Sequence, residues 1–176
     1  MAPDGKASVV LAGRAESAIP WARDTQRRGL KDVSDARLLP SMHITRVKTN
    51  ATKRGPADYF TGAVWLDEIT SPPAASDVRV VRVTFEPGAR TAWHTHPHGQ
   101  LLHIVSGVGR VQKAGEAVVE VGPGDAVWFE PGERHWHGAA PHNLMVHLAV
   151  QRADEAGKTA TWQEPVSEAD YLAGER

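Results

Sequence analysis

The sequence predicts an all-β domain, an antiparallel sandwich or barrel, from three observations. From Met42 onward the chain consists of short runs rich in valine, threonine and aromatic residues. Turns that contain glycine and proline separate these runs at short intervals, a spacing typical of antiparallel β-architectures. After residue 50, only the end of the chain, 167–172, carries any helical pattern. We therefore expect many short strands and at most one short helix.

The predicted strands follow one another along the whole domain. Each is a run of strand-forming residues that ends at a turn signal such as Pro87-Gly88 or Pro131-Gly132. In chain order the predicted strands are 42–47, 60–69, 78–86, 91–96, 101–106, 109–113, 117–121, 126–129, 135–138, 144–151 and 159–163. At the end of the chain, Ser167 precedes Asp170 by three residues, which is a weak signal for the start of a helix.

The 176 residues suffice for one domain with a substantial core. Residues 1–40 are rich in charge, alanine and glycine and have no sustained periodicity. We expect them to form an N-terminal extension, either partly disordered or an arm that packs on a neighbouring subunit. Residues 41–176 are expected to form the barrel domain.

Composition narrows the possible functions. The formal net charge is -1, so the chain has no electrostatic signature of binding to nucleic acid or to an anionic membrane. Cysteine is absent, which leaves nitrogen and oxygen ligands for any metal. The apolar run from Val9 to Ala12 is too short for a signal peptide or a membrane span. We expect a cytoplasmic protein whose partner is a small molecule.

Histidines gather at two places in the sequence. The segment from Trp93 to Gln100 reads WHTHPHGQ, and on an extended chain His94 and His96 share one face. His135 and His137 have the same spacing and follow the turn at Pro131-Gly132. Two such strands facing each other could enclose a metal with three or four protein ligands.

These motifs resemble the two halves of the cupin signature, over roughly residues 40–163. The matching residues are Gly88, His94, His96, Gln100 and Gly107 in the first half and Gly124, Pro131, Gly132 and His135 in the second. The resemblance implies a cupin double-stranded β-helix, an antiparallel jelly-roll barrel that binds a divalent metal inside. Two positions depart from the usual pattern, since Gln100 stands where the family has glutamate and Glu130 where it has proline.

The departure at Gln100 bears on the chemistry. Three neutral imidazoles and a neutral amide leave the charge of a divalent metal uncompensated, whereas a carboxylate would cancel part of it. Such a metal should be held less tightly and should act as a stronger Lewis acid. This favours polarisation of a substrate oxygen over oxygen activation.

Longer strings resemble the bacterial manganese-dependent cupin hydroxynitrile lyases: GPADYFTG at 55–62, VTFEPGARTAWHTHPHGQ at 83–100, GDAVWFEPGERHWHGAAP at 124–141 and HLAVQ at 147–151. That resemblance implies a metal-dependent carbon–carbon lyase that releases hydrogen cyanide from cyanohydrins. Carried over residue by residue, the metal ligands are His94, His96, Gln100 and His135, and the catalytic residues are His147 as base with His137 beside it. The expected metal is Mn(II), with Fe(II), Zn(II) and Ni(II) as alternatives.

Other interpretations remain open from the sequence. Gln100 could instead be a buried amide without a metal. His147 could be a structural histidine between apolar neighbours. A cupin dioxygenase or isomerase, and a small-molecule-binding cupin without enzymatic activity, are the alternative functions. The segment from Leu144 to Val150 is apolar on both faces, which favours a homodimer or homotetramer over a monomer.

Overall fold

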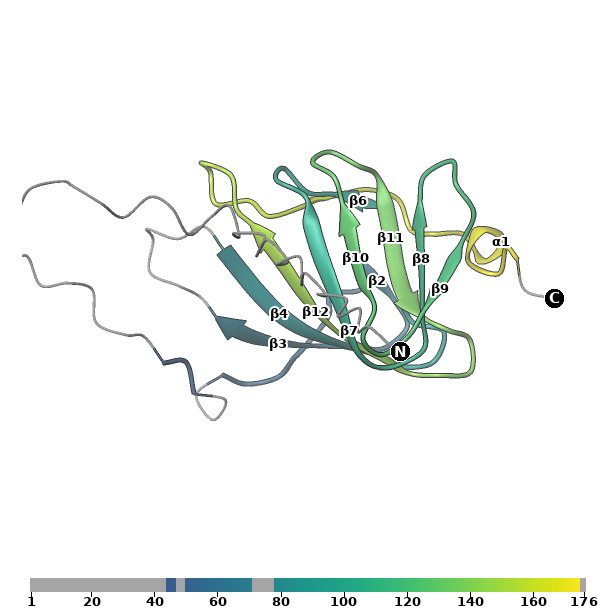
Figure 1. Cartoon of the computed structure of the whole chain (residues 1–176), viewed down its shortest axis with the longest axis horizontal. Coiled ribbons are helices and arrows are strands. Elements are labelled where there is room, and N and C mark those ends of the chain that lie inside the picture. The colour runs from purple at the N-terminus through teal and green to yellow at the C-terminus, as the bar shows by residue number, and fades with distance from the viewer. Residues whose placement is uncertain (1–43, 47–49, 71–77, 175–176) are drawn as a thin grey trace, which may run out of the picture. The chain divides into compact units, whose positions relative to one another are not determined.

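The computed structural model describes residues 44–46, 50–70 and 78–174, which contain two antiparallel β-sheets (Figure 1). The expected N-terminal extension lies outside the described residues, as do residues 42, 43 and 47 of the predicted strand at 42–47, whose described residues 44–46 are not in a strand. Within the described ranges, no helix has the length and apolarity needed to cross a membrane. The structure is nearly all-β, as the sequence predicts.

The first sheet carries six strands, and Figure 1 shows several of them side by side. In spatial order they are β1 (Lys53–Arg54), β3 (Val64–Thr70), β4 (Val78–Phe85), β12 (Met145–Arg152), β7 (Gln100–Gly107) and β10 (Ala126–Phe129). The central strand β12 pairs with β4 on one side and with β7 on the other. The chain segments that carry Gln100 and His147 are therefore hydrogen-bonded neighbours.

The second sheet is built around β11 (His135–Ala139). One side of β11 pairs with β8 (Gly109–Lys113), which in turn pairs with β9 (Val119–Val121). The other side pairs with two short strands that follow each other in the chain, β5 (Arg90–Thr91) and β6 (His94–Thr95). The sheet is completed by β2 (Phe60–Thr61) on β5 and β13 (Thr161–Trp162) on β6.

Two predicted strands are split in the structure. The run 60–69 divides at Gly62, whose φ of 82° turns the chain where a Cβ would lie 2.9 Å from the Cβ of Ala89. The run 91–96 divides at Trp93, whose backbone N–H donates to the carbonyl of Glu164 at 3.0 Å and whose carbonyl accepts from Gln163 at 2.8 Å. These bonds tie Trp93 to the C-terminal segment, so the ladder with β11 breaks there.

The main core lies between the two sheets. The first sheet contributes Val64, Val83, Phe85, Leu102, Ile104, Phe129, Met145 and Ala149, and the second contributes Val111, Val121 and Ala139. Along β12 the buried residues Met145, His147 and Ala149 alternate with half-buried ones. Strand alternation therefore directs the His147 side chain into the space between the sheets.

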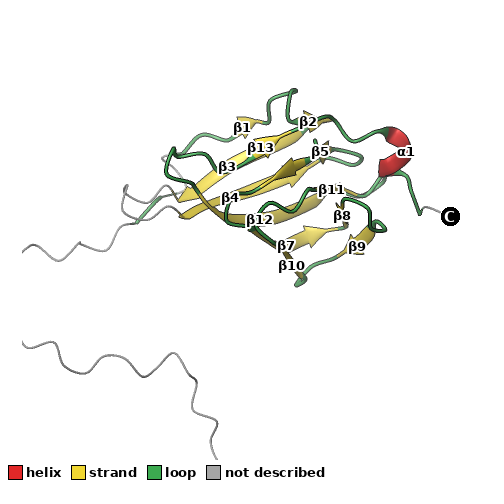
Figure 2. Ribbon diagram, turned by 90° about the horizontal axis from the view of Figure 1, so that it is seen from above, coloured by secondary structure: helices red, strands yellow, loops and turns green. Residues whose placement is uncertain are grey.

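The opposite face of β11 is covered by the C-terminal segment. Trp136, which points away from its neighbours His135 and His137, packs with Trp93, Val166 and Tyr171 in a second apolar cluster. The short helix α1 (Glu168–Tyr171) lies at one end of the strands (Figure 2). Ser167 caps it, because its Oγ accepts from the backbone N–H of Asp170 at 3.0 Å.

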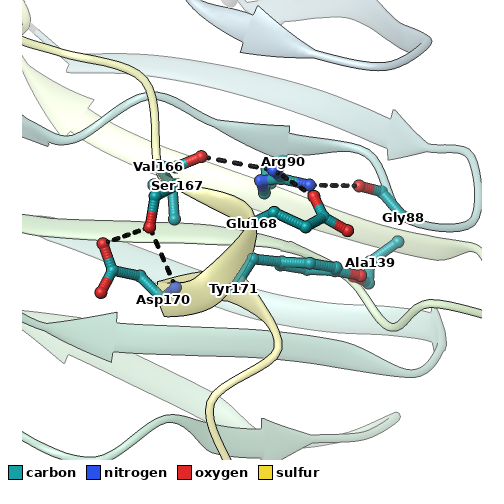
Figure 3. A network of polar contacts seen from close by, with 8 residues as sticks. All are labelled: Gly88, Arg90, Ala139, Val166, Ser167, Glu168, Asp170 and Tyr171. Carbon is teal, nitrogen blue, oxygen red and sulfur yellow. Dashed lines mark hydrogen bonds and ion pairs between the residues drawn. The ribbon is translucent and has the colours of Figure 1, made fainter.

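A buried arginine attaches α1 to the sheet (Figure 3). Arg90 donates to the carbonyl of Val166 at 3.3 Å and pairs with the carboxylate of Glu168 at 2.8 Å. Its guanidinium also lies 4.3 Å from the ring centroid of Tyr171, whose hydroxyl donates to the carbonyl of Ala139 at 2.7 Å. β11 is thus packed on both faces, against the core on one side and against the C-terminal segment on the other. This packing holds the backbone that carries His135 and His137 in place.

Candidate metal centre

Six polar side chains are buried together between the sheets. His94, His96, His135 and His137 come from the second sheet and the turn after it, and Gln100 and His147 come from the first sheet. Each of these residues is at most 4% exposed. Buried polar groups are normally paired with protein atoms, water or a bound ion, so this cluster needs a partner for every nitrogen and oxygen.

Strand register brings the two histidine motifs together. His94 and His135 are direct partners in the β6–β11 pair, and their ring centroids lie 4.3 Å apart. The ring of His96 lies 5.1 Å from that of His94 and 5.5 Å from that of His135. Gly99, with φ 77°, then turns the chain into β7 at a point where a Cβ would lie 2.6 Å from the carbonyl oxygen of Phe129. This close approach places Gln100 at the start of β7, beside the histidines.

Three of the histidines are held through Nδ1 by backbone carbonyls. Nδ1 lies 2.9 Å from the oxygen of Ala92 in His94, 2.6 Å from that of Thr159 in His96 and 2.8 Å from that of Glu133 in His135. A carbonyl can only accept, so Nδ1 carries the proton in each ring and Nε2 of the neutral ring offers a lone pair. This anchoring of one ring nitrogen is characteristic of histidines that bind a metal through the other.

The contact between His135 and Gln100 indicates the same kind of site. His135 Nε2 lies 3.1 Å from Gln100 Oε1, while the amide nitrogen of Gln100 donates to Gln151 Oε1 at 2.8 Å. In the neutral ring, whose proton is on Nδ1, both atoms of the 3.1 Å contact are acceptors. Adjacent ligand atoms at bond lengths near 2.1–2.2 Å are separated by about 3 Å when they subtend a right angle at a metal. The contact therefore fits two ligands of one cation.

The distances between ring nitrogens single out a set of three histidines that shares two members with the anchored set. One ring nitrogen from each of His94, His135 and His137 can be chosen so that all three lie within 4.8 Å of one another. His96 is absent from that group, although its Nε2 is buried without a hydrogen-bond partner among the described residues. A group of three buried histidines able to hold a metal ion is thus present. His96 and His137 differ in one respect, since a backbone carbonyl holds Nδ1 of His96 but not Nδ1 of His137.

His137 and His147 form a second kind of pair. Their rings lie 4.9 Å apart, and neither nitrogen of either ring has a hydrogen-bond partner among the described residues. Phe85 lies 5.9 Å from His137 and 5.5 Å from His147, ring centroid to ring centroid. These two imidazoles are therefore packed by an apolar neighbour but offer free nitrogens to whatever occupies the adjacent cavity.

Burial keeps the cluster uncharged. It lowers the pKa of His135 to about 4 and that of His147 to about 3, and it holds the pKa values of His94 and His137 well below the usual range. The pKa of His96 is also lowered, mainly by burial. Neutral imidazoles are the form that binds a metal, so the site is prepared for one at neutral pH.

A cavity of about 290 Å³ opens onto the cluster. It is lined by the polar residues Thr91, His94, His96, Gln100, His137, His147, Gln151 and Thr159, and by the apolar or aromatic residues Pro56, Tyr59, Phe60, Leu66, Val81, Val83, Ala149, Ala160 and Trp162. Among the described residues that line it, none carries a carboxylate. At its rim, Trp162 stacks on Tyr59 with ring centroids 4.7 Å apart and lies 4.7 Å from the ring of His94. The cavity suits a small, largely apolar molecule with a few polar atoms.

The structure thus brings the predicted site residues together: His94, His96, Gln100, His137 and His147 line one cavity, and His135 lies beside them with its Nε2 3.1 Å from Gln100 Oε1. Val81, Val83 and Ala149 line the cavity, whereas Phe85, Leu102, Ile104 and Met145 are part of the core without lining it. Sequence reasoning missed Gln151, Tyr59 and Trp162. Gln151 lies four residues after His147, so strand alternation places both on one face, a signal that was present in the sequence.

Comparisons with known proteins agree with this fold. Residues 81–150 match the family described as Cupin domain. The chain is 52% identical over 130 residues to a protein of Granulicella tundricola named (R)-mandelonitrile lyase, covering 74% of this chain and 98% of that one. A cupin-like protein of Thermotoga maritima superposes with a TM-score of 0.65 at 36% identity over 70% of this chain and 94% of its own. A polyketide cyclase of Streptomyces resistomycificus shares the fold at a TM-score of 0.57 and 18% identity, over 75% of this chain and 92% of its own.

Proposed function

This chain belongs to the cupin superfamily, and from that premise we propose that it is a metal-dependent carbon–carbon lyase that cleaves a cyanohydrin to a carbonyl compound and hydrogen cyanide. The observation that carries the proposal is the cluster of five histidines and one amide, without a carboxylate, at an apolar cavity. The relationship to a named mandelonitrile lyase at 52% identity supports the substrate class.

The metal is proposed to bind to His94, His96, Gln100 and His135. All four donors are neutral, so the charge of a divalent cation would be fully exerted on a bound substrate oxygen. Such a cation would supply Lewis-acid catalysis by lowering the pKa of the substrate hydroxyl. Mn(II) is the expected metal, and Fe(II), Zn(II) and Ni(II) are the alternatives that the donor set admits.

His147 is proposed to move the proton. Its unpartnered ring accepts the hydroxyl proton, the O–H electron pair forms the carbonyl bond, and the carbon–carbon pair leaves with cyanide. Burial lowers the pKa of His147 to about 3, so the ring is neutral before the reaction and, once protonated, gives the proton up again easily. The same ring therefore returns its proton readily to cyanide, which balances the reaction as one cyanohydrin giving one carbonyl compound and one hydrogen cyanide.

His137 and the apolar wall are proposed to position the substrate. A nitrile nitrogen or a departing cyanide can accept a hydrogen bond from the free ring of His137, which lies beside that of His147. The substituent of the cyanohydrin would then contact Leu66, Val81 and Ala149 on the apolar side of the cavity. An aromatic or branched aliphatic substituent would bury the most apolar surface there.

The test combines metal analysis with a turnover assay. Purified protein is analysed for its elements, stripped with a chelator and assayed for cyanide release from racemic mandelonitrile with and without added Mn(II). We expect release that depends on the metal and is lost in Gln100→Met, whereas His103→Gln, at an exposed histidine of β7, retains it. No release under either condition would refute the lyase. Oxygen uptake with a catechol or flavonol would then indicate a cupin dioxygenase.

A further inference from the structure

Gln100 has a fixed orientation in this structure, and the contacts at its two ends differ. Its amide nitrogen donates to Gln151 Oε1 at 2.8 Å, and its oxygen lies 3.1 Å from His135 Nε2. Gln100 and Gln151 are direct partners in the β7–β12 register, so their backbones hold the two side chains next to each other. At 3% exposure, the Gln100 amide has almost no contact with bulk water.

The orientation matters because an amide can be a metal ligand only through its oxygen. If the Gln100 amide turned by 180°, its N–H group would donate to the lone pair of His135 Nε2. That single hydrogen bond would remove two ligands at once, the amide oxygen and the imidazole nitrogen. A neutral hydrogen bond contributes on the order of 1 kcal/mol, so the turned orientation would compete with metal binding unless another group opposed it.

Gln151 is the group that opposes the turn. In the turned orientation, the oxygen of Gln100 would face Gln151 Oε1, which now accepts from the Gln100 amide nitrogen, unless the Gln151 amide turned at the same time. Two acceptors in contact repel each other, and the amide nitrogen of Gln100 would lose its partner. Gln151 lines the same cavity as His147 and reaches the metal site through its hydrogen bond with Gln100, so its effect on the three anchored histidines passes through Gln100.

We propose that Gln151 is a positioning residue that holds the amide oxygen of Gln100 toward His135 and thereby sets the affinity of the site for its metal. This inference rests on the proposed role of Gln100 as a metal ligand. Residues that orient a ligand without touching the metal typically change affinity by roughly 10- to 100-fold. The same range is expected for the loss of the Gln151 carbonyl.

The test is a double-variant cycle on the metal-free protein, titrated with Mn²⁺ alone. Gln151→Met keeps the length of the side chain but removes the acceptor, and we expect it to weaken Mn²⁺ binding by roughly 10- to 100-fold. In the Gln100→Glu background both carboxylate oxygens can bind metal, so orientation no longer matters. There, adding Gln151→Met should change the affinity by less than about 3-fold. Gln151→Glu, whose two oxygens both accept, should retain the wild-type affinity or exceed it.

The outcomes separate this inference from the proposed function. An equal loss of affinity from Gln151→Met in both backgrounds would indicate a packing effect and would overturn the positioning role. No loss in either background would overturn it as well. If Gln100→Met left Mn²⁺ binding unchanged, Gln100 would not be a ligand and both proposals would fail. The free energy of unfolding of each metal-free variant shows whether the fold is retained.

Discussion

The rings of His137 and His147 lie 4.9 Å apart at an interplanar angle of 80°, on β11 and β12 of opposite sheets. Among the described residues, neither ring has a partner for either nitrogen. His94, His96 and His135 differ from them, because a backbone carbonyl holds Nδ1 in each of these three rings. The five histidines therefore divide into three that are oriented for a metal and two that are free to exchange a proton or a hydrogen bond.

Leucine substitutions at His147, His137 and His96 test that division, because leucine fills a similar volume and offers no ligand atom. His147→Leu should retain the metal and lower kcat by roughly 10²- to 10⁴-fold, the usual contribution of a general acid–base. His137→Leu should also retain the metal, whereas His96→Leu should lose it. Metal content by elemental analysis and cyanide release provide the two measurements.

The opposite metal result would reassign the ligands. Loss of metal in His137→Leu together with retention in His96→Leu would favour the set His94, His135 and His137, which distance alone selects. Unchanged turnover in His147→Leu with metal bound would remove His147 from the reaction. His103→Leu, at an exposed position of β7, controls for the substitution itself.

Acid should destabilise the metal-free protein. Burial lowers the pKa of His135 to about 4 and that of His147 to about 3, whereas the unfolded chain titrates near the ordinary value of 6.5. The unfolded state therefore binds more protons as the pH falls below 6.5, and stability that is present above that pH is lost on the way down to pH 4 and pH 3. Each such histidine contributes a slope of about 1.4 kcal/mol per pH unit in that window.

Urea denaturation of the metal-free protein between pH 7.5 and pH 5 measures this slope. His147→Leu removes one titrating group. The free energy of unfolding of this variant should therefore fall less steeply as the pH is lowered, by the slope that one bound proton contributes. Identical slopes for the wild type and this variant would show that His147 does not remain neutral in the folded protein.

The sequence predicted the strands and the site more fully than the cavity. Strand periodicity and turn residues located β8 and β10 to the residue, and the two histidine motifs together with the family resemblance identified six polar side chains that are buried together in the structure. The division of the 91–96 run was not predictable, since it depends on backbone bonds between Trp93 and the distant C-terminal segment. Trp162 was missed for the same reason, because its contacts with His94 and Tyr59 join segments far apart in the chain.

The pairing of β7 with β12 should depend on Gly107. Its φ is 81°, and a Cβ there would lie 1.9 Å from the carbonyl oxygen of Leu144. Gly115 has a similar φ of 83° with open space around it. Gly115→Ala should therefore cost only the strain of a left-handed residue, about 1–2 kcal/mol. Gly107→Ala should cost about 3 kcal/mol or more, because backbone must move as well.

Chemical denaturation of the two glycine variants gives the comparison. Equal losses of stability would mean that the backbone at Leu144 can move away from a Cβ at position 107 without a loss of free energy of unfolding. Since Gly107 pairs with Met145, two residues before His147, a larger loss in Gly107→Ala should be accompanied by reduced turnover. Gly115→Ala should leave turnover unchanged.

Ala149→Leu should narrow the cavity without touching the metal site. Ala149 is 4% exposed and lines the cavity from β12, whereas Val150, the next residue, points to the opposite face of the same strand. A leucine at 149 would occupy the space proposed for the substituent of the cyanohydrin. We expect KM for mandelonitrile to rise about 10-fold or more, a change within the 1–3 kcal/mol range of steric discrimination in apolar pockets. The KM for a cyanohydrin with a small aliphatic substituent should rise less. Val150→Leu should leave the KM of both substrates unchanged. Equal effects of both substitutions, or equal effects on both substrates, would show that the substituent does not bind against Ala149.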